Sequence, residues 1–141
     1  CTYHAFPYLK AAGSAYVITM ASVASLFAAP SEVTYAASKF WVKGFTEALN
    51  MEWERHGIHV CDIMPNFVKT PMVEQNPGKL IEVSGVAFTP EDVAATVWKA
   101  LSGKRIHWLL ERPLYRFSYA IMKVLVPDTL VRRILKRNAG F

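Results

Sequence analysis

Cysteine is scarce in this sequence, and its scarcity excludes one class of small protein. The 141 residues include two cysteines, Cys1 and Cys61, which lie far apart along the chain. A fold built on a framework of disulfides is therefore excluded, and a reducing compartment, the cytosol, is expected. The four histidines show no spacing with cysteine or carboxylate residues that is typical of metal ligands, so we expect no metal site.

Glycine and long apolar runs are also limited. The seven glycines are spread from Gly13 to Gly140, and no two lie close enough to form a Gly-rich phosphate-binding turn. The apolar stretches near the carboxyl end are interrupted and too short to span a membrane. With 52% hydrophobic residues the chain can still bury one core, so we expect one globular domain or part of one.

Acidic residues are nearly absent from the carboxyl-terminal tail. Residues 1–112 carry ten basic and ten acidic side chains, whereas residues 113–141 carry six basic ones and one acid, Asp128. The net charge of +5 therefore lies in the tail. We treat residues 113–141 as a segment separate from the domain at 1–112 and expect this segment to be helical. After a first helix at 113–126, Asp128 is expected to cap a second one, with an apolar side formed by Leu130, Val131, Ile134 and Leu135.

The basic tail has two interpretations. Basic amphipathic helices often lie on anionic membranes, so residues 113–137 could make the protein membrane-peripheral. Alternatively, the tail packs over the substrate cleft or a dimer partner while its cations are solvated. Nucleic acid is not expected as a partner, because the tail has no known binding motif and basic charge alone is nonspecific.

The pattern along the chain is an alternation of helices and strands, which predicts an α/β fold. Apolar, β-branched runs favour strands buried in a parallel sheet, and Gly57 and Gly103 are expected to end helices. Thr89 is expected to cap one helix, with Pro90 at its first position. The expected helices cover residues 2–12, 33–55 and 90–102, and the expected strands cover residues 15–21, 58–64 and 106–110.

The long helix expected at 33–55 has a wetter side and a large apolar surface. The wetter side is expected to hold Thr46, Glu47, Asn50 and Glu54. The apolar surface, which core burial or contact with a second copy would explain, holds Phe40, Trp41, Phe45, Leu49 and Trp53.

Tyr35 and Lys39 are the most informative pair in the chain. They lie four residues apart in an expected helix, so both side chains lie on one face. A nearby ammonium group stabilises a phenolate, which allows such a pair to act as a general acid and base at neutral pH. The alternative is a solvated helical pair in which Tyr35 packs on the stem of Lys39.

Two further segments are expected to meet this pair. Ser22 follows the strand at 15–21 directly, and the loop at 65–71 follows the strand at 58–64. Because the carboxyl ends of parallel strands meet at one edge of a sheet, where open α/β sheets bind ligands, these groups are expected to converge. By itself Ser22 could merely cap local backbone, and Thr70 could cap the following helix.

With these residues in this order, the chain resembles the short-chain dehydrogenase/reductase (SDR) family, from about residue 1 to about residue 103. In that family a Ser, a Tyr and a Lys occur with this spacing, the Tyr-x-x-x-Lys motif included, and a Pro-Gly-x-x-x-Thr loop follows the next strand. Ser22, Tyr35 and Lys39 match the catalytic positions.

The loop at 65–70 is similar to the family's loop that holds the nicotinamide end of the cofactor. Pro65, Val68 and Thr70 match its pattern, so the resemblance implies that they bind NAD or NADP together with Tyr35 and Lys39. Asn66 stands where the family usually has Gly. Because Asn tolerates a positive φ, we expect the turn to form all the same.

The resemblance implies the carboxyl-terminal part of a Rossmann-type, doubly wound parallel sheet and an oxidoreductase activity. Hydride would pass between a nicotinamide cofactor and a carbonyl or alcohol substrate, with Tyr35 as the general acid and base, Ser22 holding the substrate oxygen, and Lys39 assisting Tyr35 and binding the cofactor ribose. A homo-oligomer formed through the helix at 33–55 is also implied.

The family's Gly-rich amino-terminal segment has no counterpart among these residues. We therefore interpret the chain as the catalytic half of a longer enzyme and expect it to be inactive alone. Residues 72–88 match the family's substrate lid, and their apolar side chains favour an apolar substrate. The alternative is a non-catalytic relative that keeps the fold as a binding or membrane-peripheral scaffold protein.

Overall fold

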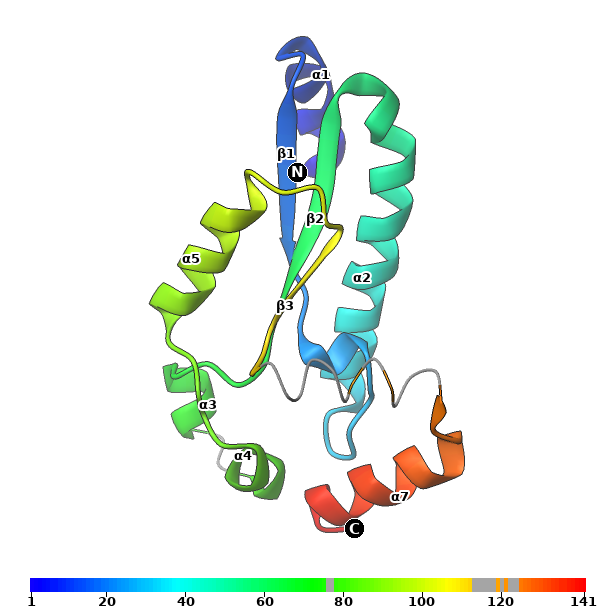
Figure 1. Cartoon of the computed structure of the whole chain (residues 1–141), viewed down its shortest axis with the longest axis vertical. Helices are drawn as coiled ribbons and strands as arrows, with labels where there is room; N and C mark the ends of the chain where they lie inside the picture. The colour runs from blue at the N-terminus through cyan, green and yellow to red at the C-terminus, as the bar shows by residue number, and fades with distance from the viewer. Residues whose placement is uncertain (76–77, 113–118, 120, 122–124) are drawn as a thin grey trace.

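A three-stranded parallel sheet with helices on both faces forms the centre of the protein (Figure 1). The structure, a computed structural model, describes residues 1–75, 78–112, 119, 121 and 125–141. The first expected helix of the tail, at 113–126, lies largely outside these described residues. In chain order the elements are α1 (Thr2–Ala11), β1 (Ala15–Met20), the 3-10 turn η1 (Val23–Ser25), α2 (Val33–Trp53), the 3-10 turn η2 (Glu54–His56), β2 (Ile58–Pro65), α3 (Pro71–Gln75), α4 (Lys79–Ser84), α5 (Pro90–Ala100), β3 (His107–Leu110) and α7 (Asp128–Ala139).

The strands lie in the order β1-β2-β3, and all are parallel. The register pairs Ala15 of β1 with Ile58 of β2, and Asp62 of β2 with His107 of β3. Each expected strand and helix of residues 1–112 is present within three residues of its expected bounds. The α/β class and the parallel sheet predicted from the sequence are confirmed.

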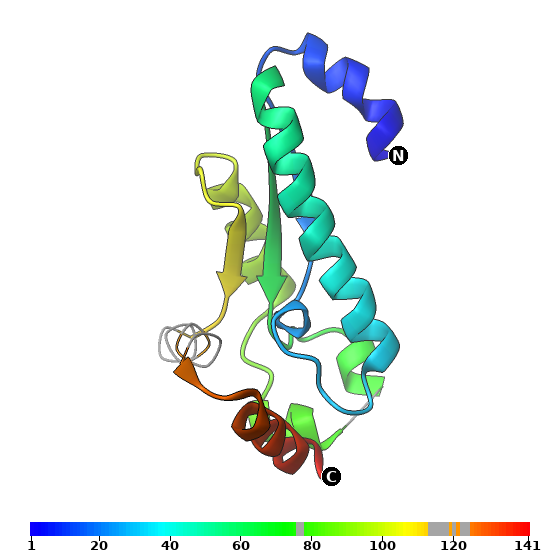
Figure 2. The same cartoon turned by 90° about the vertical axis from the view of Figure 1, so that its right-hand side faces the viewer.

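Strand β2 lies at the centre of the core, because its side chains alternate between the two faces of the sheet and are buried against a different helix on each. Ile58 and Val60 pack with Trp53 of α2, whereas Cys61 and Ile63 pack with the α5 side of the sheet. Figure 2 shows α2 and α5 on opposite faces of the sheet. Each large aliphatic side chain buried in this way contributes roughly 1.5–3 kcal/mol to folding. The run at 58–64 is thus a buried strand, as its composition predicts.

Strand β1 is less buried than its composition predicts. Tyr16 is 37% exposed and Met20 is 44% exposed. Among the described residues only β2 pairs with β1, so β1 lies at the edge of this sheet. The prediction of a buried strand is therefore wrong for β1, because no further strand of the described residues pairs with its outer edge.

Gly57 joins α2 to the sheet at a point where no other residue fits. Its φ is +71°, in the left-handed region, and it ends the turn that follows α2. A Cβ atom at this position would lie 2.4 Å from the carbonyl oxygen of Gly13. The Gly57 carbonyl also accepts a hydrogen bond from the amide of Ala15 at 3.1 Å. The stop predicted at Gly57 is confirmed.

The cap predicted at the amino-terminal end is correct for α5 and wrong for α7. Thr89 and Asp92 form a reciprocal capping box at the start of α5, as expected from Thr89 followed by Pro90. In α7 the N-cap is Pro127, which makes no side-chain cap hydrogen bond, and Asp128 is the first residue of the helix. The cap predicted at Asp128 is therefore wrong, although its charge still lies at the positive end of the helix dipole.

Thr46 is another correction. It was expected on the wetter side of its helix, yet it is fully buried. Its hydroxyl donates to the carbonyl oxygen of Val42 at 2.8 Å and pairs with the hydroxyl of Thr19 on β1 at 2.6 Å. The expectation is wrong because a polar side chain can be buried at little cost when its hydrogen bonds are satisfied inside the protein.

A chain of charged side chains connects α2 with β2 and β3. His107 donates from Nδ1 to Asp62 and from Nε2 to Glu47, each at 2.9 Å, and Lys43 pairs with the same Glu47. Asp62 is fully buried, whereas a third of the His107 side chain is exposed. The hydrogen bond with Asp62 raises the pKa of His107 above its ordinary value, and the one with Lys43 lowers the pKa of Glu47.

The two cysteines are free thiols, with Cys1 exposed and Cys61 buried. Burial raises the pKa of Cys61 to about 11, so little reactive thiolate forms at neutral pH. Among the described residues no helix has the length and apolar character needed to cross a membrane.

Candidate active site

The residues predicted to form the site gather at the carboxyl edge of the sheet, where β1 and β2 end. Helix α2 begins at this edge, and η1 and the loop after β2 lie there too (Figure 1). Two hydrogen bonds between distant segments define the arrangement. Lys39 of α2 contacts Met20, the last residue of β1, and Ser22 contacts Pro65, the last residue of β2.

Lys39 fixes the start of α2 against the sheet. Its ammonium group donates to the carbonyl oxygen of Met20 at 2.9 Å and lies 5.5 Å from the centre of the Tyr35 ring. Burial lowers the pKa of Lys39. An ammonium group has three N–H donors, and no described residue accepts a hydrogen bond from the other two. Tyr35 is 38% exposed.

Ser22 lies at the join between β1 and the turn η1, and its side chain is almost buried. Its hydroxyl accepts a hydrogen bond from the amide of Ala24 at 3.2 Å and donates to the carbonyl oxygen of Pro65 at 3.4 Å. Ser22 therefore caps η1, which is the local role that the sequence left open, and at the same time bridges two strand ends. The second contact is long, so the hydroxyl can turn to another acceptor at little cost.

Ser25 and Ser38 each donate a hydrogen bond to a backbone carbonyl oxygen nearby. Ser25 bonds to Ser22 and is buried, and Ser38 bonds to Tyr35 at 2.7 Å. These contacts hold the backbone at Ser22 and Tyr35, two of the three residues that the sequence predicts to be catalytic.

The loop at 65–70 is attached on one side to a distant segment. Val68 forms an isolated parallel bridge with Phe88, and the amide of Lys69 donates to the carbonyl oxygen of Phe88 at 2.8 Å. Thr70 donates from its hydroxyl to the carbonyl oxygen of Val68 at 3.3 Å. The Thr70 side chain thus contacts its own loop and makes no side-chain cap of α3.

Asn66 takes a role that the sequence did not predict. A positive φ was expected here, but Ser31 is the one non-glycine with positive φ among the described residues, so this expectation is wrong. The Asn66 side-chain amide instead donates to the buried carboxylate of Glu111, just after β3, and its backbone amide donates to Leu110. The turn forms because side-chain hydrogen bonding replaces the backbone freedom of Gly. No local pattern indicates a partner 45 residues away.

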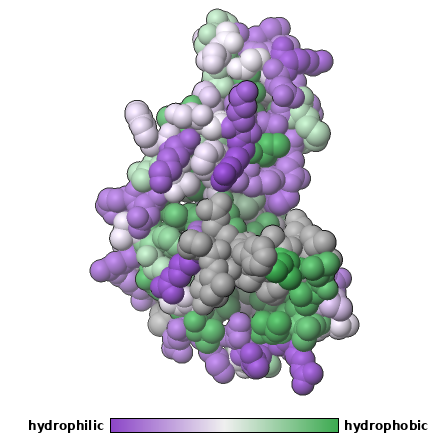
Figure 3. Space-filling view, in the orientation of Figure 1, coloured by the Kyte–Doolittle hydropathy of each residue, from purple (hydrophilic) through white to green (hydrophobic). Residues whose placement is uncertain are grey.

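Apolar side chains surround the edge of the sheet at which these residues lie. Figure 3 shows hydrophobic side chains gathered in the lower half of the face, where α3, α4 and α7 lie. Met72, Val83 and Val86, in the segment predicted to be a lid, are 62%, 55% and 42% exposed. Within the described ranges, no group of three or more His, Cys, Asp or Glu side chains is placed to hold a metal ion.

Comparison with known sequences identifies the family. The sequence model described as short chain dehydrogenase matches residues 1–80, which is more than half of the chain and includes every predicted site residue. The chain belongs to the short chain dehydrogenase family. The resemblance drawn from Ser22, Tyr35, Lys39 and the loop at 65–70 is therefore confirmed at the level of the family.

Individual short chain dehydrogenases are similar to this chain over only part of their own length. The (3R)-3-hydroxyacyl-CoA dehydrogenase of Homo sapiens is 33% identical over 87 residues, which are 57% of this chain and 33% of the human protein. This chain thus spans about a third of that relative.

Two solved structures show the same fold. A short chain dehydrogenase from Burkholderia cenocepacia J2315 in complex with NADP has a TM-score of 0.74 and 21% identity, over 92% of this chain and 50% of that one. A 4-hydroxyisoleucine dehydrogenase complexed with NADH has a TM-score of 0.64 and 19% identity, over 77% of this chain and 50% of that one. This chain therefore has the fold of about half of each of these dehydrogenases.

Proposed function

We propose that the whole protein to which this chain belongs is an oxidoreductase that uses NAD or NADP to interconvert a carbonyl compound and the corresponding alcohol. The observation that carries the proposal is a pair of hydrogen bonds at one edge of the sheet. Lys39 holds the Tyr35 helix to the end of β1, and Ser22 joins the ends of β1 and β2. Membership of the short chain dehydrogenase family supports the same reaction class.

The chain's own residues fit a nicotinamide cofactor at this edge. Lys39 keeps two N–H donors without a partner among the described residues, which suits the hydroxyl groups of a ribose. Pro65, Val68 and Thr70 form the loop that would hold the nicotinamide end. Related structures bound to NADP and to NADH support this assignment.

In the direction of reduction, Tyr35 gives its phenolic proton to the substrate oxygen, and Ser22 donates a hydrogen bond to that oxygen. The bound cofactor supplies the hydride, so one hydride on carbon and one proton on oxygen convert the carbonyl to an alcohol. Lys39 stabilises the phenolate left on Tyr35. In the direction of oxidation the phenolate takes the proton back. The exposed Met72 and Val83 beside this edge favour a substrate with an apolar part.

We expect the whole protein to turn over a substrate and residues 1–141 alone to show no turnover. This comparison tests the proposed function. The measurement is nicotinamide absorbance with a panel of carbonyl and alcohol compounds, each with NAD and with NADP. The isolated chain is expected to fail because it spans about half of each related structure, and β1 lies at an open edge.

Two outcomes would contradict these proposals. Turnover by the isolated 141 residues would show that the rest of the protein is dispensable. A whole protein that binds NAD or NADP in a titration but converts no compound would instead favour a non-catalytic binding role.

We also propose that α2 mediates a homo-oligomer. Trp41 is 65% exposed and its ring stacks on Phe45, and Phe40 and Met51 are 45% and 70% exposed on the same helix. Exposed aromatic surface of this kind is typical of an interface.

Trp41→Glu is expected to reduce the sedimentation coefficient of the whole protein to that of a monomer, because a carboxylate cannot be buried unpaired in an apolar contact. Trp98→Glu is the matched control, since Trp98 is 75% exposed on α5, on the other face of the sheet. If both variants sediment like the parent, α2 is not the interface.

A further inference from the structure

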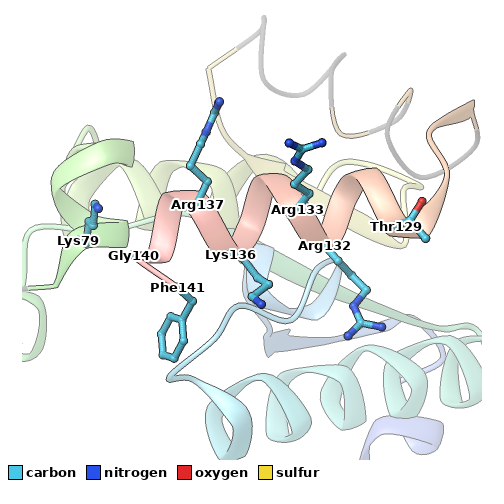
Figure 4. Close-up of a pocket in the computed structure, with 8 residues that line it drawn as sticks. All are labelled: Lys79, Thr129, Arg132, Arg133, Lys136, Arg137, Gly140 and Phe141. Atoms are coloured by element: carbon cyan, nitrogen blue, oxygen red, sulfur yellow. The ribbon is translucent and has the colours of Figure 1, made fainter.

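A hollow between α4 and α7 is lined by cations that the proposed reaction does not use. Its volume is about 610 Å³, and it is open to solvent. Four of the cations come from α7 and one from α4, and the aromatic ring of Phe141 lies at one end (Figure 4). We call this hollow the α4–α7 pocket; the residues used in the argument are Lys79, Arg132, Arg133, Lys136, Arg137 and Phe141.

The cations are arranged in two rows along one face of α7. Arg132 and Lys136 are one turn apart, and Arg133 and Arg137 are likewise one turn apart. Figure 4 shows the first row pointing to one side of the helix and the second row to the other. The trough between the rows is therefore bordered by positive charge on both sides.

Lys79 brings a fifth cation from a different element. It is the first residue of α4, and its stem lies across Gly140 at the end of α7, where a Cβ atom would be 2.9 Å from the Lys79 Cδ atom. Gly140 has a φ of +85°, so this position favours glycine on two grounds. A ligand held in the pocket would contact both α7 and the predicted lid.

No acidic side chain neutralises these cations. All eleven acidic residues of the chain lie in the described ranges, and none of them forms an ion pair with any of the five cations. Like charges one helical turn apart repel each other, so Arg132 and Lys136, and equally Arg133 and Arg137, destabilise α7. An anion bound in the trough would remove this repulsion.

The apolar side of α7 faces the protein. Val131 is buried and Ile134 and Leu135 are half-buried, and α7 packs against α4. Only Leu130, of the four residues predicted to form that side, is largely exposed. A helix that lies in a membrane surface inserts its apolar side, and here most of that side is already occupied. The lining from two elements, with Lys79 of α4 beside the cations of α7, favours a compact anion over a flat membrane surface.

We propose that the α4–α7 pocket binds the phosphate or diphosphate group of a soluble organic ligand, whose apolar part contacts Phe141. Arginine side chains suit this role because their planar forks donate paired hydrogen bonds to phosphate oxygens. The backbone amide of Phe141 donates to the carbonyl oxygen of Lys136 at 2.9 Å, which fixes the chain at this end of the pocket.

The test is calorimetric titration of the whole protein with pyrophosphate at low ionic strength. The double variant Arg133→Gln/Arg137→Gln is expected to weaken binding at least about tenfold, because two charge-assisted contacts are lost. The control, Lys99→Gln/Lys104→Gln, removes the same charge from exposed positions at the other end of the sheet and is expected to bind like the parent. Circular dichroism verifies that each variant is folded.

A second arm separates the possible sources of phosphate. The same proteins are sedimented with phosphatidylcholine vesicles that contain or lack phosphatidylserine, and the parent is expected to stay in solution. Sedimentation with anionic vesicles without pyrophosphate binding would overturn the proposal in favour of a membrane surface. Equal binding by the parent and the pocket variant, or equal loss in both variants, would overturn it as well. The titration needs no turnover, so its failure is distinct from a failure of the proposed reaction.

Discussion

Replacing Tyr35 by Phe in the whole protein is expected to lower kcat by about 10²- to 10⁴-fold, the usual contribution of general acid–base catalysis. The change removes a single oxygen atom. The ring can keep its place at the start of α2, near the Lys39 ammonium, because neither the fold nor the contact of Lys39 with Met20 depends on the phenolic oxygen. Cofactor affinity is therefore expected to stay close to that of the parent.

The separation of turnover from binding makes this experiment decisive. Rates are measured by nicotinamide absorbance and cofactor affinity by fluorescence titration. Tyr16→Phe is the matched control, since Tyr16 has nearly the same exposure, 37% against 38%, but lies on β1 and faces His59. If the Tyr35 variant turns over as fast as the parent, Tyr35 carries no proton in the reaction, and the role proposed for Lys39 is lost with it.

Features that depend on near neighbours in sequence could be predicted. The start of α5 follows from Thr89 and Pro90, because a capping box involves residues three positions apart. The end of the Tyr35 helix follows from Gly57, since a left-handed residue is needed there.

Features that depend on distant partners could not be predicted. Thr46 was expected to be exposed, and its burial depends on Thr19, 27 residues away. Asn66 was interpreted through backbone conformation alone, whereas its side chain has a partner in Glu111. His107 joins two carboxylates from separate elements, a role that its place in the sequence does not indicate. In each case the polar residue type was visible, but its partner is brought near only by the tertiary fold.

The His107 network leads to the second large effect. His107→Phe is expected to lower the melting temperature of the whole protein by about 5–10 °C, which corresponds to about 2–3 kcal/mol. Phe fills a similar volume but donates no hydrogen bond, so the fully buried Asp62 side chain loses the one hydrogen-bond partner that it has among the described residues. Asp62 already has one buried carboxylate oxygen, Oδ1, without a hydrogen bond among the described residues. Burying an unpaired carboxylate is costly, whereas burying an apolar group there is not.

The double variant Asp62→Leu/His107→Phe is the control that isolates this cause. Removing both partners removes the buried charge, so the double variant is expected to regain most of the lost stability. Glu47 keeps its ion pair with Lys43 in both variants. If the double variant is less stable than His107→Phe alone, the loss comes from packing at β3 and not from an unpaired Asp62.

The pH dependence of stability gives an independent signature of the same network. Asp62 raises the folded-state pKa of His107 above the 6.5 of a free imidazole, because the charged ring donates to two carboxylates. A group with a raised pKa contributes its full stability below its unfolded pKa and loses that contribution as the pH rises through its folded pKa. Relative to the double variant, the parent is therefore expected to be most stable below about pH 6.5 and to lose this advantage as the pH rises through the raised folded-state pKa of His107. If the difference in melting temperature between the parent and the double variant is the same at every pH, His107 does not bind a proton on folding. Its contacts with Asp62 and Glu47 are then those of a neutral imidazole.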